Sequence, residues 1–178
     1  MNLEKLYKKQ EELDNHILGK EYDRTGKLPD KFMLLDQTIL ALLVEIGELA
    51  NATRCFKHWS TKGPMPDEII IDELADVWHF YLSIGNQLGI RLDEELIMEN
   101  EEIWEYLNSG KTNCFINLYI MASEVGVLGN EDTTIRNYIE FGVLLLGLGE
   151  LLGFTDEEVE QAYLKKHEEN YRRQREGY

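Results

Sequence analysis

Apolar residues recur along this chain with a spacing close to 3.6 residues, and no stretch alternates apolar and polar residues as a half-buried strand would. The pattern therefore predicts helices in nearly all of the chain. Short loops between the periodic segments contain the helix-breaking residues Gly26, Pro29, Gly63, Pro64 and Pro66. We expect about seven helices, over residues 2–21, 30–56, 67–88, 93–108, 112–129, 133–153 and 156–175.

These elements predict an all-α fold, a helical bundle that forms a single domain over residues 1–178. The stretch 142–153, GVLLLGLGELLG, is more apolar than one buried face of a helix requires. It is therefore predicted to be either the central core of the bundle or an interface with another subunit.

Four acidic residues interrupt the apolar pattern of the second and third predicted helices. Glu45 and Glu48 lie three residues apart within the apolar stretch 39–50, and Glu73 and Asp76 repeat this spacing on the next helix. Residues at i and i+3 share one face of a helix. Two such helices packed antiparallel would therefore bring four carboxylates together in one partly buried site.

Four ionised carboxylates in one site need compensating positive charge, since two like charges 4 Å apart repel by about 4 kcal/mol at an effective dielectric constant of about 20. Oxygen ligands without nearby His or Cys favour hard cations, so we predict a Mg²⁺ site, with Mn²⁺ as the alternative. A second interpretation stays open, in which the acids pair with Lys or Arg or face solvent. His58 and His79 have no partner at metal-ligand spacing, and we expect both to be structural.

The last predicted helix carries a row of residues suited to binding phosphate. Lys166, Asn170 and Arg173 follow each other at i, i+4 and i+7, so they share one face. The Arg guanidinium can form paired hydrogen bonds to phosphate oxygens, and Lys supplies a compact positive charge. From the residues alone, the alternative is ordinary surface charge.

Composition and charge limit the classes of partner. With 34 acidic and 18 basic residues, the formal net charge of −16 argues against nucleic acids and anionic membranes as partners. The charged N-terminal residues do not resemble a signal peptide, and the longest apolar run, 141–149, is too short to span a bilayer. Cys55 and Cys114 have no metal-binding spacing and are predicted to be reduced packing residues. We therefore expect a cytoplasmic protein.

Three sequence segments resemble a known family. EIGE at 45–48 followed by ELAD at 73–76 resembles the ExxE…ExxD signature of the all-α NTP pyrophosphatases, the MazG-like superfamily. The tail AYLKKHEENYRRQREGY at 162–178 and the segment ELANATRCFKHW at 48–59 are similar to the dimeric dUTPases of that superfamily. The resemblance implies an all-α dUTPase-like bundle and a homodimer whose pocket borrows residues from the partner.

The resemblance also implies roles for individual residues. It implies that Mg²⁺ is held by Glu45, Glu48, Glu73 and Asp76. It implies that the phosphates are bound by Lys166, Asn170 and Arg173, and that the base or sugar is recognised by Gln10, Asp14 and Trp59. For Trp59 the residues themselves leave open a second interpretation, a loop aromatic that fills a gap in the core.

Together these observations predict a Mg²⁺-dependent dUTP diphosphatase that releases dUMP and pyrophosphate, which limits uracil in DNA and supplies dUMP for thymidylate synthesis. Glu48 is the predicted general base that orients or deprotonates the attacking water. Uracil would be distinguished from cytosine by hydrogen bonds to its O4 and N3–H, which an amide such as that of Gln10 can make. In this branch of the superfamily, attack at the β-phosphorus would make dUDP a substrate as well.

Two alternatives are kept beside this prediction. One is a related house-cleaning pyrophosphatase with another base preference, such as dCTP or a modified nucleotide. The other is a non-catalytic helical assembly protein whose acids merely pair with basic residues.

Overall fold

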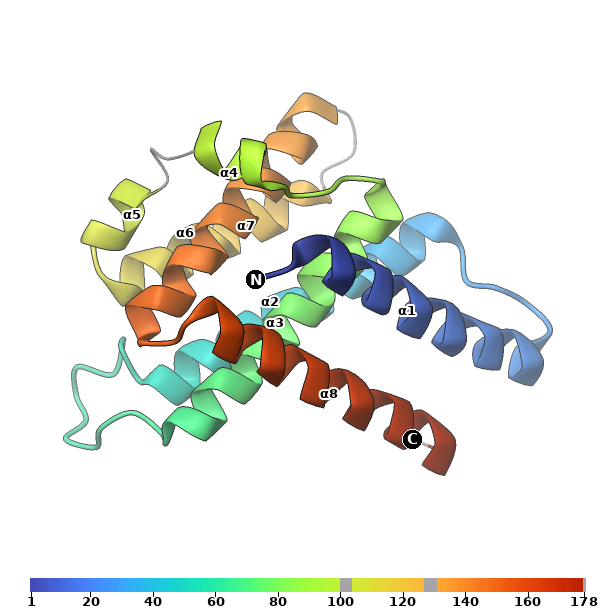
Figure 1. The fold of residues 1–178 in the computed structure, drawn as a ribbon, viewed down its shortest axis with the longest axis horizontal. Helices are drawn as coiled ribbons and strands as arrows, with labels where there is room; N and C mark the ends of the chain where they lie inside the picture. The colour runs from blue at the N-terminus through green and yellow to red at the C-terminus, as the bar shows by residue number, and fades with distance from the viewer. Residues whose placement is uncertain (100–103, 127–130, 178) are drawn as a thin grey trace.

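The computed structural model describes residues 1–99, 104–126 and 131–177, and in these ranges it contains helices and loops but no strand (Figure 1). This confirms the predicted all-α class. The helices of the described residues are α1 (Leu3–Thr25), α2 (Lys31–Thr53), α3 (Asp67–Leu88), α4 (Glu94–Glu99), α5 (Trp104–Asn108), α6 (Lys111–Val125), α7 (Glu131–Leu152) and α8 (Asp156–Glu176).

Most helix ends follow from local chemistry. Helix α2 begins after Asp30, whose side chain accepts hydrogen bonds from two backbone N–H groups of the first turn. It ends at Thr53 and not at residue 56 as predicted, because Arg54 adopts a left-handed conformation with φ 57° and closes the last turn. Helix α1 runs four residues beyond its predicted end, to Thr25, and is closed by Gly26 with φ 71°.

Two predicted helices reach into residues that are outside the described ranges. The helix predicted over 93–108 corresponds to α4 and α5, and residues 100–103 between them are not among those described. The helix predicted over 112–129 corresponds to α6, which ends at Val125, and its expected last residues also lie outside the described ranges.

Helix α3 lies at the centre of the arrangement and, among the described residues, packs against α1, α2, α7 and α8. It pairs with α2 in an antiparallel hairpin, and α1 and α8, from opposite ends of the chain, lie side by side against it (Figure 1). Helices α6 and α7 form a second hairpin, which joins the first through contacts of α6 with α2 and of α7 with α3. The two hairpins and the α1/α8 pair therefore meet around α3.

Of the two interpretations of the apolar stretch 142–153, the central core is the one that the structure bears out. Val143, Leu144, Leu145 and Leu148 on α7 are each at most 1% exposed. Since the chain itself buries this helix, its apolar character no longer argues for an interface.

The crossing of α3 and α7 depends on two glycines. The rings of Tyr81 on α3 and Tyr138 on α7 stack with centroids 4.4 Å apart and an angle of 7° between their planes. A Cβ atom on Gly142 would collide with the Tyr81 hydroxyl, and one on Gly85 would collide with the Tyr138 hydroxyl. Each helix thus provides a glycine beneath the tyrosine of the other, which lets the two backbones approach closely.

Two further predictions concern the cysteines and membrane insertion. Cys55 and Cys114 are both free, as predicted. Within the described ranges no single helix is long and apolar enough to span a membrane; α7 and α8 satisfy the criteria of length and composition only as a pair, bent by 106°.

Candidate active site

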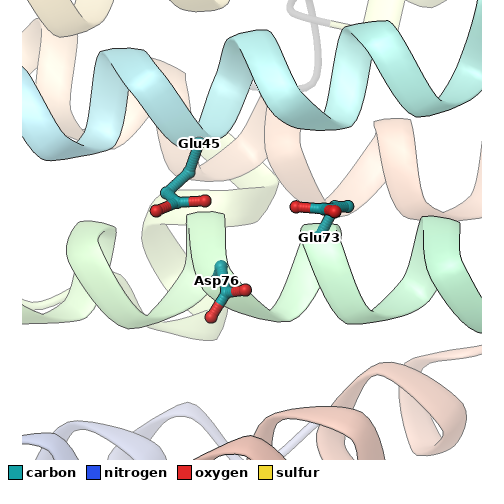
Figure 2. Close-up of side chains that lie close together, drawn as sticks. All are labelled: Glu45, Glu73 and Asp76. Atoms are coloured by element: carbon teal, nitrogen blue, oxygen red, sulfur yellow. The ribbon is translucent and has the colours of Figure 1, made fainter. Parts of the chain in front are cut away.

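Three of the four predicted acidic ligands converge between α2 and α3. Glu45 points from α2 toward α3, where Glu73 and Asp76 lie one turn apart (Figure 2). One carboxylate oxygen from each residue lies within 4.8 Å of the others. The spacing of these acids on two antiparallel helices therefore produces the predicted cluster.

Glu48, the fourth predicted ligand, is exposed and is not part of this group of three. Its charge nevertheless acts on the group, because it contributes to the raised pKa values of Glu45 and Glu73. Glu48 therefore lies at the edge of the cluster.

The cluster is electrostatically strained. Burial, together with the charges of Asp76, Glu48 and Glu73, raises the pKa of Glu45 to about 7. Burial and the neighbouring carboxylates also raise the pKa of Glu73. A divalent cation would remove this repulsion, and a donor set made only of carboxylate oxygens fits a hard cation.

Lys166 already compensates part of the negative charge. Its buried Nζ lies 2.6 Å from Oδ2 of Asp76 and 2.6 Å from Oδ2 of Asp72. Burial by itself would lower the pKa of Lys166, but the hydrogen bonds to the two aspartates outweigh it and the pKa is raised. The pKa of Asp76 is also raised, since burial outweighs the opposing effect of Lys166. Pairing of an acid with a lysine, the second interpretation of the motif, is thus realised at Asp76.

Asp72 is not among the site residues predicted from the sequence. Its position four residues before Asp76 places both on one face of α3, which is the signal that could have identified it.

A cavity of about 380 Å³ adjoins the acid cluster and includes residues from three of the predicted groups. Its polar lining residues include Glu45 and Asp76 from the cluster, Asn170 and Arg173 from the tail, and Gln10 and Asp14 from α1. Its apolar lining is formed by Leu13, Ile17, Leu18, Leu34 and Phe80. The cavity has room for a small ligand with a charged end near the cluster and a less polar part beside α1.

The predicted phosphate row is only partly available for a ligand. Asn170 and Arg173 line the cavity, and Nη2 of Arg173 also lies 2.6 Å from Oε1 of Glu169. Lys166 does not line the cavity and is held by Asp72 and Asp76.

Gln10 and Asp14 also line the cavity and belong to a buried hydrogen-bond network. Oε1 of Gln10 accepts a hydrogen bond of 2.9 Å from the Tyr163 hydroxyl and lies 2.7 Å from Nδ1 of His79. Nε2 of Gln10 donates to Oδ1 of Asp14 over 2.7 Å. Both acceptor positions of the Gln10 oxygen are therefore in use, and the amide offers a ligand only an N–H.

Asp14 presents the complementary acceptor. Within the described part of the chain its buried Oδ2 has no well-formed hydrogen bond. Burial raises the pKa of the Asp14 carboxyl to about 6, against the opposing effects of the Gln10 amide and the nearby Ser83 hydroxyl. At neutral pH the site therefore combines an amide donor with a carboxylate acceptor.

Trp59 is not brought together with these residues. Its side chain is 67% exposed in the loop between α2 and α3, in an edge contact with Phe56 at 6.0 Å, and it does not line the cavity. The interpretation of Trp59 as an aromatic that fills a gap in the core is therefore wrong.

His79 and Tyr163 are functional candidates that sequence analysis did not assign to the site. Both contact Gln10 in the space between α1, α3 and α8. These contacts could not be predicted from the sequence, because Gln10, His79 and Tyr163 are far apart along the chain.

Two comparisons with known proteins bear on this geometry. The comparison with curated proteins gives no match. The family model described as dUTPase matches residues 2–178, almost the whole chain. The all-α architecture and the carboxylate cluster are consistent with that match. The chain belongs to this dUTPase family, and it hydrolyses dUTP as a dUTP diphosphatase.

Proposed function

We propose that the diphosphatase is a Mg²⁺-dependent enzyme of one domain, residues 1–178, with its active site in the cavity between α1, α2, α3 and α8. The observation that carries the proposal is that one cavity is lined by acid-cluster residues, by Asn170 and Arg173, and by Gln10 and Asp14. These residues match the two chemically distinct ends of a deoxynucleoside triphosphate: the anionic phosphates, and a base with hydrogen-bonding edges.

The proposed ligands of Mg²⁺ are Glu45, Glu73 and Asp76, with Glu48 at the edge of the group. Mn²⁺ is the alternative ion. Bound there, Mg²⁺ would neutralise phosphate charge, orient the water and offset the charge on the leaving group. Glu48 is the proposed general base. Since it is exposed and outside the group of three, its carboxylate keeps lone pairs to accept the proton of the attacking water.

The tail residues are proposed to hold the phosphates. Asn170 and Arg173 can do so from the positions at which they line the cavity. Lys166 can do so only if it exchanges Asp72 or Asp76 for phosphate oxygens, which becomes favourable when a cation takes over the charge of Asp76.

Uracil recognition is assigned to Gln10 and Asp14. The free N–H of Gln10 would donate to the uracil O4, and Oδ2 of Asp14 would accept the uracil N3–H. Cytosine has an amino group at C4 and an unprotonated N3. The N–H of Gln10 would then face the amino group, another donor, and the oxygen of Asp14 would face N3, another acceptor. A site built in this way rejects the wrong base strongly, because its buried polar groups are left unpaired.

The test is a pyrophosphate-release assay with dUTP, dCTP and dTTP, each with and without Mg²⁺, together with phosphate release from dUDP. The proposal expects Mg²⁺-dependent turnover of dUTP well above that of dCTP, and turnover of dUDP. Thymine presents the same O4 and N3–H as uracil, so dTTP tests whether the cavity also excludes a methyl group at C5. Preferential hydrolysis of dCTP would refute the assignment of Gln10 and Asp14, and full activity after removal of all divalent ions would refute the metal site.

We also propose a homodimer that forms through exposed apolar residues on the adjacent helices α2 and α6. Leu40 and Val44 on α2 are 63% and 50% exposed, and Ile116 and Ile120 on α6 are 53% and 49% exposed. Paired faces of this kind are typical of interfaces between subunits. Sedimentation should give a dimer that Ile120→Glu dissociates, and a stable wild-type monomer near 20.8 kDa at micromolar concentration would contradict the proposal.

Trp59 is proposed to contact base or sugar only within this dimer. Because it does not line the cavity of its own chain, a second subunit must bring the loop to a cavity. Trp59→Ala should then raise KM for dUTP, whereas Met65→Ala, an exposed side chain in the same loop, serves as the control and should leave KM unchanged. An unchanged KM would remove Trp59 from the site. We place the enzyme in the cytoplasm, where it would limit uracil in DNA and supply dUMP for thymidylate synthesis.

A further inference from the structure

Uracil and cytosine differ in the direction of two hydrogen bonds, so discrimination by Gln10 depends on which way its amide points. A rotation of the amide by 180° exchanges Oε1 and Nε2 with little change of shape. A flipped Gln10 would present an acceptor to the base and would fit the amino group of cytosine. Something in the protein must therefore fix the amide in one orientation.

Tyr163, His79 and Asp14 surround the Gln10 amide and hold it in one orientation. The Gln10 side chain is 4% exposed, and its Oε1 lies between the Tyr163 hydroxyl at 2.9 Å and Nδ1 of His79 at 2.7 Å. In the flipped orientation, Oε1 would instead face Oδ1 of Asp14, an acceptor opposite an acceptor at 2.7 Å. Three neighbours thus favour the same orientation.

His79 is the stronger of the two donors. The Tyr163 hydroxyl has a second acceptor at 3.4 Å, the backbone oxygen of Leu6, to which it could turn if Gln10 flipped. His79 is 3% exposed and its ring stacks on Tyr163 with centroids 4.1 Å apart, so it has little freedom to turn away. Burial lowers the pKa of His79 to about 3, so the ring is neutral and carries a single N–H.

That N–H must be at Nδ1, because the Gln10 oxygen can only accept. Within the described residues, Nε2 of His79 has no well-formed hydrogen bond, although the backbone oxygen of Tyr163 also interacts with the ring. The tautomer of one buried histidine and the orientation of one amide are therefore coupled.

We propose that His79, assisted by Tyr163, is a positioning residue that holds the Gln10 amide as a donor toward the base and thereby sets the preference for uracil over cytosine. This inference rests on the proposed recognition of uracil by Gln10 and Asp14. His79 does not touch the base itself; it acts through Gln10.

The test compares the ratio of kcat/KM for dUTP to kcat/KM for dCTP in matched variants. His79→Leu removes the donor at similar volume and should lower this ratio at least tenfold. Tyr163→Phe should lower it less. The control is His167→Leu, which removes a histidine that is also buried on the α1 side but is bonded to the backbone oxygen of Lys9 and not to Gln10. The control should lose stability and keep the ratio.

The outcomes distinguish the positioning role of His79 from the proposed recognition of uracil by Gln10 and Asp14, on which it rests. If Gln10→Leu and Asp14→Asn leave the ratio unchanged, the proposed base recognition fails. If they lower the ratio and a folded His79→Leu variant does not, recognition by Gln10 stands and the positioning role of His79 is overturned.

A measurement on the wild-type protein covers the case in which His79→Leu does not fold. ¹⁵N NMR of the imidazole rings distinguishes the two neutral tautomers, and the signals of His79 can be assigned by replacing the other three histidines in turn. The proposal requires the Nδ1–H tautomer, with no titration between pH 6 and 8. An Nε2–H tautomer would mean that the amide points the other way, and would overturn the proposal.

Discussion

Replacing Glu45 by Gln should stabilise the metal-free protein at alkaline pH while it removes a proposed ligand. The carboxyl pKa of Glu45 is raised from 4.5 to about 7 in the folded protein by burial and by three neighbouring carboxylates. An acid whose pKa is higher in the folded than in the unfolded state destabilises folding once it is ionised in both states. The difference between 4.5 and about 7, at 1.36 kcal/mol for each pKa unit, corresponds to about 3.4 kcal/mol.

Because Glu45 is only half-buried, solvent screening reduces this value, and we expect a gain of about 1–2 kcal/mol for Glu45→Gln at pH 8. Because the pKa of Glu45 is raised in the folded protein, the gain in stability depends on pH. Below pH 4.5 the carboxyl is protonated in both states and costs nothing, whereas above pH 7 the full cost is present. At pH 5 the gain should therefore fall to about a quarter of its value at pH 8.

The assay is urea denaturation in EDTA at pH 8 and pH 5, with Asp36→Asn, an exposed carboxylate on the same helix, as the control. The control should change stability by no more than about 0.5 kcal/mol at either pH. Added Mg²⁺ should stabilise the wild type more than the Gln variant, because the proposed ion site exists only in the folded protein. A variant less stable than wild type at pH 8, or a gain of equal size at both pH values, would refute the electrostatic account of the cluster.

Three further predictions concern other residues of the site. Glu48→Gln should lower kcat by about 10²–10⁴-fold at saturating Mg²⁺ in steady-state kinetics; near-normal turnover would exclude it as the base. Lys166→Met should destabilise the metal-free protein by about 1–3 kcal/mol, since the partly buried Asp76 loses its partner. In the same denaturation experiment, the exposed Lys165→Met should change stability little, and equal losses would count against the buried ion pair. Because the pKa of Asp14 is about 6, the preference for dUTP over dCTP should weaken as pH falls through 6, and Asp14→Asn should abolish this pH dependence.

The sequence predicted the helices and the acid cluster well, for a reason that lies in local geometry. The helical period determines which residues share a face, so Glu73 and Asp76 can be placed together before their surroundings are known. The same rule was too coarse for Glu45 and Glu48. Residues three apart still differ by about 60° around the axis, and on a helix at the edge of a bundle this angle separates a half-buried side chain from an exposed one.

The side-chain contacts between helices could not be predicted from the sequence. Lys166 and Asp72 are 94 residues apart, and Gln10 and Tyr163 are 153 apart. Which of them meet depends on how α1 and α8 are rotated about their axes against α3. That rotation is set by the packing of whole helix faces and not by any short pattern.

The reciprocal fit of Tyr81 with Gly142 and of Tyr138 with Gly85 has a consequence for how this chain can evolve. Enlarging either glycine is incompatible with the tyrosine above it, and shrinking either tyrosine opens a void between α3 and α7. A single substitution at any of the four positions should therefore be selected against, whereas a paired exchange of small for large could be neutral. Among homologous sequences these positions should co-vary as two pairs, a signal that reflects helix packing although Tyr81 and Gly85 share their helix with Glu73 and Asp76, two of the proposed metal ligands.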